Sequence, residues 1–297
     1  MGHHHHHSSS GDTSVALAVA INLGLTVVQV GAGLIAGSLS LIADALHNFS
    51  DAVALMIAFA ARRIARRPAD SQMTFGYGRI EAVAALVNYT TIVVIGLYLL
   101  YEAAIRFADP SPVTGWIIVV VAGGALLVDL VTAALTYRLS KNSINIRAAF
   151  LHNVADALGS VAVILAGTLV LLFGWLWVDP LVTVMIAGYI LWQSAVEFPV
   201  VVRILMLGSP PDIDTAQVVK AMRGIDGVAS VHHVHLWQMQ EHEPALDAHV
   251  VLTPQGDAAA VRQKIRTILG EEFDIRHCTL ETEEDGDACD NPSLIGH

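Results

Sequence analysis

Six long apolar runs constrain this chain more than any other feature of its sequence. They cover residues 14–36, 39–61, 80–105, 113–137, 147–174 and 178–204. About 20 apolar residues in a helix are enough to cross the hydrocarbon core of a bilayer. Backbone in lipid must satisfy its own hydrogen bonds, so such runs predict α-helices. Only 14% of the residues are charged, against about 25% in soluble domains. The sequence therefore predicts a membrane protein with six transmembrane helices.

The charges separate a second region from the apolar one. Residues 1–208 contain 10 Lys+Arg and 11 Asp+Glu, whereas residues 209–297 contain 6 and 16. Nearly all of the net charge of −11 therefore lies in the second region, which is long enough for one small soluble domain. An acidic domain does not suit nucleic acid, which favours basic surfaces, but it suits metal cations. Two cysteines, Cys278 and Cys289, are too few for a disulfide framework and indicate a cytosolic domain.

Basic residues occur in alternate links between the apolar runs, which predicts the topology. They are Arg62, Arg63, Arg66, Arg67 and Arg79 after the second run, Arg138, Lys141 and Arg147 around the link between the fourth and fifth runs, and Arg203 at the end of the sixth. Because cytoplasmic links carry the excess of Lys and Arg, both termini and the acidic domain are expected in the cytoplasm. The first apolar run is too long for a cleavable signal peptide and lacks a basic leader.

One polar motif interrupts two of the apolar runs. Its first copy is Leu46-His47-Asn48-Phe49-Ser50-Asp51-Ala52, and its second, 105 positions later, is Leu151-His152-Asn153-Val154-Ala155-Asp156-Ala157. An Asp in the middle of a transmembrane helix costs about 2.5–3.5 kcal/mol, so such a residue indicates function. The i, i+4 spacing places each His and its Asp on one helical face, one turn apart. The predicted topology makes the two helices antiparallel, so they resemble two halves of one site between inverted repeats.

Two imidazoles and two carboxylates form a donor set that suits Zn²⁺ in tetrahedral geometry. The two carboxylates also balance the charge of the ion, which makes a loaded site less costly to hold in a membrane. Metal ligands must be deprotonated, so protons compete with metal, and imidazole titrates in the physiological range. The alternatives are an interhelical hydrogen-bond network, an intramembrane metalloenzyme or a metal sensor. Asp44 and Asp129 are further polar residues in the runs, expected to line the cavity or to pair with a neighbour.

The acidic region shows the pattern of a small α+β domain. We expect an amphipathic helix over 213–223, strands over 228–239 and 245–252, a helix over 257–270 and a strand over 274–283. The order αββαβ resembles a ferredoxin-like sandwich without its first strand. The predicted organisation is a tail or tag at 1–13, the transmembrane domain at 14–207, the soluble domain at 208–283, and a flexible tail at 284–297 rich in acids, Gly and Pro. The run His3–His7 is either an expression tag or a natural tail.

Histidines are frequent in the soluble domain. Val231-His232-His233-Val234-His235-Leu236-Trp237 lies on the first predicted strand. Regular alternation places His233 and His235 on one face and His232 on the other. Spacing alone does not choose metal ligands among the remaining candidates, which are His242, His249, His277, Cys278, Glu283 and Cys289.

These residues resemble the cation diffusion facilitator family. The resemblance rests on the stretch from Gly37 through His47 to Asp51, on its copy at His152 to Asp156, and on the Val-His-x-Val-His-x-Trp strand. It extends to Arg67-Pro68-Ala69-Asp70 and Phe75-Gly76-Tyr77-Gly78-Arg79, and covers about residues 14–283. It implies a homodimer in a lipid membrane, with six transmembrane helices and a cytoplasmic metallochaperone-like domain. Such a protein exports metal from the cytoplasm in exchange for protons and is not an enzyme. The His-x-x-x-Asp pairs resemble the zinc-preferring branch, with Cd²⁺ and Co²⁺ as alternative ions.

The resemblance also assigns residues to sites. It places the transport site at His47, Asp51, His152 and Asp156. It places a second, cytoplasmic site at His232, His249 and Glu283. A further ligand that it implies for this site is Cys289, which the C-terminal tail of the partner subunit supplies. Two departures matter. Some family members bind another ion through histidines in the loop after the second apolar run. In this chain Met73 and Tyr77 occupy the matching positions, so Asp70 is the one ligand that remains there. The link at 140–145 is short, which favours a bacterial protein of the cytoplasmic (inner) membrane.

Overall fold

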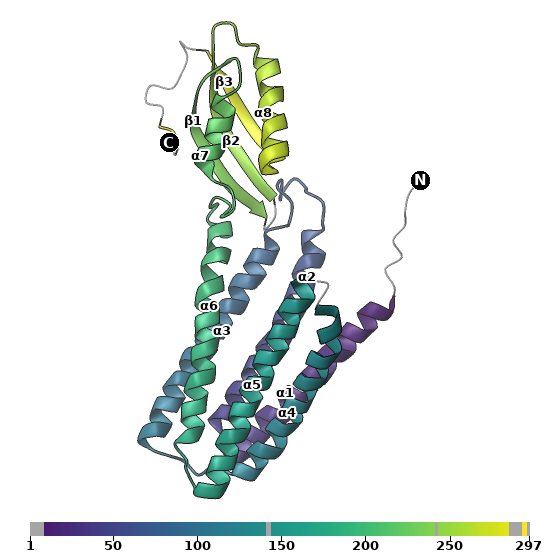
Figure 1. Cartoon of the computed structure of the whole chain (residues 1–297), viewed down its shortest axis with the longest axis vertical. Helices are drawn as coiled ribbons and strands as arrows, with labels where there is room; N and C mark the ends of the chain where they lie inside the picture. The colour runs from purple at the N-terminus through teal and green to yellow at the C-terminus, as the bar shows by residue number, and fades with distance from the viewer. Residues whose placement is uncertain (1–8, 141–143, 241–242, 285–292, 296–297) are drawn as a thin grey trace. The chain divides into compact units, whose positions relative to one another are not determined.

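Six long helices form the first part of the chain. The computed structural model describes residues 9–140, 144–240, 243–284 and 293–295. The helices are α1 (Ser9–Ala36), α2 (Leu39–Ala65), α3 (Ile80–Ala108), α4 (Gly115–Ser140), α5 (Ile144–Phe173) and α6 (Val178–Leu205), shown in Figure 1. Among the described residues, five of these helices are long and apolar enough to cross a membrane, and α1 contributes a shorter apolar segment, Leu23–Ala36. The predicted transmembrane helical fold is confirmed.

A small α/β domain follows. Its elements are α7 (Thr215–Arg223), β1 (Val228–Gln240), β2 (Glu243–Leu252), α8 (Ala258–Phe273) and β3 (His277–Glu283). The sheet order is β1-β2-β3, with β1 and β2 antiparallel and β2 and β3 parallel. The predicted αββαβ order is confirmed. The last strand begins later than the predicted residue 274, because Asp274 has a left-handed φ of 53° and caps α8.

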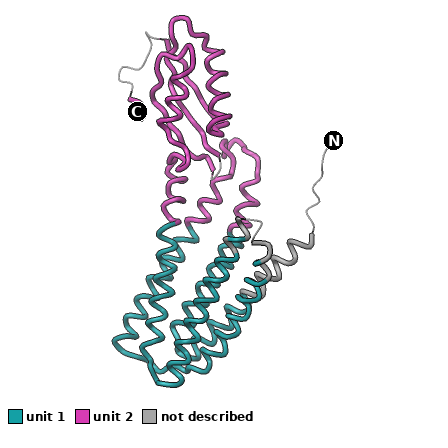
Figure 2. The backbone as a smooth tube through the Cα atoms, in the orientation of Figure 1, with its two compact units in different colours: residues 1–57, 87–196 teal, residues 58–86, 197–297 magenta. Residues whose placement is uncertain are grey.

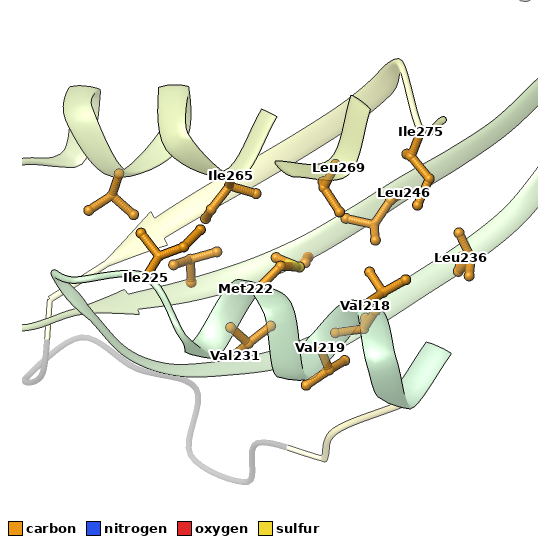
Figure 3. Close-up of a cluster of buried hydrophobic side chains, with 14 of the residues drawn as sticks. Val218, Val219, Met222, Ile225, Val231, Leu236, Leu246, Ile265, Leu269 and Ile275 are labelled. Carbon is orange, nitrogen blue, oxygen red and sulfur yellow. The ribbon is translucent and has the colours of Figure 1, made fainter. Parts of the chain in front are cut away.

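The core of this domain lies between the two helices and one face of the sheet. Val218 and Met222 of α7, Ile265 and Leu269 of α8, and Leu246 of β2 have no exposed surface. Figure 3 shows their side chains pointing toward one another. Both helices begin at an Asp whose side chain accepts a backbone N–H, which satisfies one of the free donors at a helix start. The apolar stripe of each helix and the inward face of the strands thus form one core.

The chain divides into two compact units, drawn teal and magenta in Figure 2. The first contains residues 1–57 and 87–196, and the second contains residues 58–86 and 197–297.

Within the first unit, α4 and α5 pack closely because glycines face each other. A Cβ added at Gly115 would lie 2.5 Å from the carbonyl oxygen of Gly167. Small residues permit such close approach between membrane helices.

A buried carboxylate fixes the start of α2, the helix that carries the first polar motif. Asp179 of α6 has no exposed surface. It accepts hydrogen bonds from the hydroxyls of Ser38 and Ser40 at 2.6 Å each and from the backbone N–H of Leu39 at 2.8 Å. Gly37 turns the chain between α1 and α2 with a φ of 69°. An oxygen acceptor at a helix N-terminus satisfies N–H groups that have no partner within the helix.

Candidate metal sites

The four polar residues of the two repeated motifs come together in the first unit. His47 Nε2 lies 3.2 Å from Asp156 Oδ1, and His152 Nε2 lies 3.1 Å from Asp51 Oδ2. Within each motif, His47 Nε2 is 3.7 Å from Asp51 Oδ2, and His152 Nε2 is 3.5 Å from Asp156 Oδ2. Each histidine therefore contacts the carboxylate of the other helix as well as its own. This crosswise pairing is the one that two antiparallel helices with the same i, i+4 motif produce.

Three of the four residues, without His152, offer donor atoms that are close enough to share one ion. One ligand atom from each of His47, Asp51 and Asp156 lies within 4.8 Å of the other two. Asp51 Oδ2 is buried and makes no assigned hydrogen bond among the described residues, although His152 Nε2 lies 3.1 Å from it. A buried oxygen without a hydrogen bond is costly unless a cation or a proton completes it. The residues present thus fit a divalent cation held by imidazole and carboxylate ligands.

Other polar residues in the helices pair with neighbours. Asp44, which is 3% exposed, accepts a hydrogen bond from Gln29 Nε2 at 2.8 Å. Asp129 accepts one from Ser160 Oγ at 3.2 Å. Of the two roles expected for these carboxylates, pairing is the one seen. The ring of Tyr189 from α6 lies edge-on to His47 with a centroid distance of 6.3 Å. Sequence reasoning missed Tyr189, because nothing in the local pattern of α6 separates it from a packing aromatic.

A second cluster forms in the soluble domain from three separate strands. His232 lies on β1, His249 opposite it on β2, and Glu283 at the end of β3. Glu283 Oε1 lies 2.5 Å from His249 Nδ1, and Glu283 Oε2 lies 3.4 Å from His232 Nε2. His249 Nε2 is also 3.4 Å from Glu281 Oε2. The structure therefore brings together the three described residues that the resemblance assigned to a cytoplasmic site, and adds Glu281 beside them.

His233 joins this cluster, contrary to the expectation from strand alternation. Its ring centroid lies 5.0 Å from that of His232 and 4.9 Å from that of His249. The register passes from His232↔His249 to His235↔Asp247, so β1 contains one extra residue at this point. Such a β-bulge interrupts alternation, and His233 adopts a left-handed φ of 47°. The prediction that His232 and His233 point to opposite faces is therefore wrong.

Burial favours the neutral form of His232. The residue is 3% exposed, and neither ring nitrogen makes a hydrogen bond among the described residues. Burial lowers the pKa of His232 below its usual value of 6.5, and Glu283 opposes this effect. A neutral imidazole is the form that binds a metal, and a ring nitrogen without a hydrogen bond is available to it. The donor set of this cluster also fits a divalent cation, since one nitrogen from each of His232, His233 and His249 lies within 4.8 Å of the others.

Two of the remaining sequence candidates, His277 and Cys278, make other contacts. His277 packs edge-on against Phe75 with a ring-centroid distance of 6.4 Å. Cys278 packs against the hydrophobic core of the domain. His242, Cys289 and the run His3–His7 lie outside the described residues.

Asp70 uses both of its oxygens within its own loop. Oδ1 accepts the backbone N–H groups of Gln72 and Met73 at 2.8 and 2.9 Å, and Oδ2 accepts the hydroxyl of Tyr77 at 2.7 Å. The hydrogen bond from Tyr77 and the two backbone donors lower the pKa of Asp70 below its ordinary value. The carboxylate thus closes a turn in this loop, a common role for Asp.

The fold and the paired sites define a class, that of multi-pass membrane proteins with histidine–carboxylate clusters suited to cations. Two family models identify the family within it. The model of the cation efflux transmembrane domain matches residues 15–206, and that of the cation efflux protein cytoplasmic domain matches residues 210–285. The chain therefore belongs to the cation efflux family, also called cation diffusion facilitators, as the paired motifs predicted. It is a metal-cation transporter of the bacterial type rather than an enzyme.

Curated relatives match along nearly the whole chain. The metal cation efflux system protein CzcD of Cupriavidus metallidurans is 34% identical over 306 residues, covering 99% of this chain and 96% of the relative. A cadmium, cobalt and zinc/H(+)-K(+) antiporter of Bacillus velezensis is 33% identical, with 99% and 96% covered. The zinc transporter ZitB of Escherichia coli is 34% identical, with 90% and 85% covered. Among solved structures, the metal-bound C-terminal domain of the CzcD transporter is 30% identical and covers 24% of this chain and 99% of its own, with a TM-score of 0.23.

Proposed function

We propose that this protein exports Zn²⁺ from the cytoplasm in exchange for protons, and that the ion binds between His47, Asp51, His152 and Asp156. The observation that carries the proposal is the crosswise pairing of the two motifs, with each histidine within 3.2 Å of the carboxylate of the opposite helix. Membrane histidines and aspartates are expensive, and here four of them converge. The names of the relatives, which include a zinc transporter and a zinc/H(+)-K(+) antiporter, agree with this substrate.

Exchange with protons follows from the chemistry of the ligands. The ion binds to neutral imidazoles and ionised carboxylates, so each protonated ligand disfavours metal. When the ion leaves, protons on the histidines let them donate to the same carboxylates, at the distances seen between the two helices. The negative charge of the two carboxylates is thus balanced in both states, by the metal ion in one and by protons in the other. An empty and unprotonated site would leave buried negative charges uncompensated.

The basic links and the family support a bacterial inner-membrane location with both termini in the cytoplasm. In this orientation the soluble domain is in contact with the compartment from which metal is removed. The match to the cytoplasmic-domain model of the family supports a homodimer. We further propose that His232, His249 and Glu283 hold a second divalent ion, resident rather than transported. Such an ion would link three strands of the sheet and report cytoplasmic metal to the transporter.

The test is zinc flux into proteoliposomes with an acidic interior. We expect the purified protein to accumulate Zn²⁺ inside the vesicles, and the rate to fall when a protonophore dissipates the pH gradient. Cd²⁺, Co²⁺ and Mn²⁺ should be measured in parallel, because imidazole and carboxylate ligands accept several of these ions. Zinc accumulation that is insensitive to the pH gradient would contradict proton exchange while leaving the metal site in place. No flux of any divalent ion would contradict the proposal as a whole.

A further inference from the structure

The C-terminal tail returns to the cytoplasmic histidine cluster. Residues 284–297 were expected to be flexible from their composition, but three described residues of the tail, Ser293 to Ile295, pair with β1. The backbone N–H of His233 donates to the carbonyl of Ser293, and that of Val234 donates to the carbonyl of Leu294, both at 3.0 Å. Ile295 forms a parallel bridge with Val234. In this short stretch the tail thus adds a strand-like segment to the edge of β1 that faces away from β2.

The pairing depends on the bulge in β1. In a regular strand, successive N–H groups point to opposite edges, so two neighbouring residues cannot both donate to the same partner strand. Here His233 and Val234 both donate to the tail. The left-handed φ of 47° at His233 reorients one peptide group and makes this possible. The bulge therefore gives the free edge of β1 two adjacent N–H donors for the tail.

The same bulge places the third imidazole in the cluster. Adjacent residues of a regular strand point to opposite faces, yet the rings of His232 and His233 are 5.0 Å apart. A single ion can contact both rings only while the bulge persists. Docking of the tail and binding of a metal to these imidazoles therefore require the same conformation of the backbone at His233.

We propose that His233 is a further ligand of the cytoplasmic metal site, and that the tail segment Ser293–Ile295 is a clasp coupled to that site through the bulge. Metal bound by His232, His233 and His249 stabilises the bulge and so favours the docked tail. A docked tail in turn holds His233 in place and raises the affinity for metal. Coupling of this kind is reciprocal and amounts to about 5–150-fold in affinity in typical cases. The inference rests on the second metal site of the proposed function, and not on transport.

Hydrogen exchange of the full-length protein in detergent, read by mass spectrometry, tests the coupling. Zn²⁺ is added to chelator-treated protein while exchange is followed in β1, β2 and the C-terminal peptide. We expect zinc to slow exchange at His233, Val234 and in the tail by at least about fivefold. A chain that ends at Pro292 should need at least about fivefold more zinc to protect β2. A matched control that lacks only Gly296 and His297 keeps the paired residues and should behave as the full chain.

Two substitutions at one position separate the imidazole from the backbone. Asn tolerates a left-handed φ, so His233→Asn should keep the tail docked without zinc but lose most of the additional protection that zinc confers. Val disfavours a left-handed φ because its side chain is β-branched, so His233→Val should release the tail with or without zinc. Equal zinc dependence in His233→Asn and the original protein would overturn the role of the imidazole.

The two proposals fail in different ways. Zinc protection of β1 and β2 with no change in the tail would overturn the clasp and leave the cytoplasmic site standing. An absence of any zinc protection in β1 and β2 would overturn the cytoplasmic site and the clasp together. Neither result bears on zinc flux through the helices, which proteoliposomes measure separately.

Discussion

The two histidine–carboxylate clusters of this protein have similar donor groups but are built in different ways. The transmembrane cluster comes from two copies of one motif on two helices, and its contacts follow from a spacing of four residues. The cytoplasmic cluster takes single residues from three strands and a further one, His233, from a bulge. The comparison shows that the convergence of paired side chains on helices can be predicted from sequence, whereas a cluster in a sheet depends on register and on local irregularity.

The largest expected effect follows from loss of a carboxylate in the transmembrane cluster. Asp51→Asn keeps the shape of the side chain but removes the charge that Asp51 offers to both His47 and His152. We expect zinc flux in proteoliposomes to fall by at least about 100-fold, since even outer-shell substitutions cost about 10–100-fold in metal sites. Asp109→Asn, in the link after α3, serves as a control. Flux in Asp51→Asn within a factor of about two of the original would remove this residue from the transport site.

A change of donor type sharpens the comparison. His47→Asp replaces a borderline-soft nitrogen with a hard oxygen, while the i, i+4 geometry of the helix remains. We expect the ratio of Mn²⁺ to Zn²⁺ flux to rise on the order of tenfold, because oxygen ligands suit harder cations. The matching substitution His249→Asp in the sheet should leave this flux ratio unchanged. An equal shift in both variants would show that selectivity does not reside in the transmembrane cluster.

Glu283→Ala tests whether the two clusters act independently. Both carboxylate oxygens of Glu283 face histidines of the cytoplasmic cluster, at 2.5 and 3.4 Å. We expect zinc affinity measured at this cluster by hydrogen exchange to fall by about tenfold or more. The substitution leaves the four residues of the transmembrane cluster unchanged, so zinc should still be transported. Complete loss of flux in Glu283→Ala would mean that the cytoplasmic ion is obligatory for transport.

The smallest effect is expected at Asp70, a carboxylate outside both clusters. Its oxygens are already engaged by Tyr77, Gln72 and Met73. Asp70→Asn keeps a carbonyl oxygen for the turn, so zinc flux should stay within about twofold of the original, as for surface substitutions generally. A loss of flux comparable to that of Asp51→Asn would assign a metal to this loop despite Met73 and Tyr77.

Much of the fold was predictable because it depends on local patterns. Runs of about 20 apolar residues predict membrane helices, and periods of 3.6 and 2 residues distinguish helices from strands in the soluble domain. The αββαβ order followed from these patterns. The convergence of His47, Asp51, His152 and Asp156 followed from the i, i+4 spacing together with the antiparallel topology that the basic links predict. Strand limits were less predictable. Asp274 ended α8 with a left-handed cap where the apolar pattern indicated a strand.

What the sequence determined by itself is the set of elements and the two helical His-x-x-x-Asp pairs, since hydrophobicity and i, i+4 spacing act within a single element. Only the tertiary structure decided which strand residues meet. One extra residue in β1 forms the bulge that brings His233 beside His232. The same bulge presents the N–H groups of His233 and Val234 to the tail. It also decided that Asp179 caps the start of α2 from more than 130 positions away. The reason is physical: the positions of a bulge and of a distant acceptor depend on partners that the local chain does not encode.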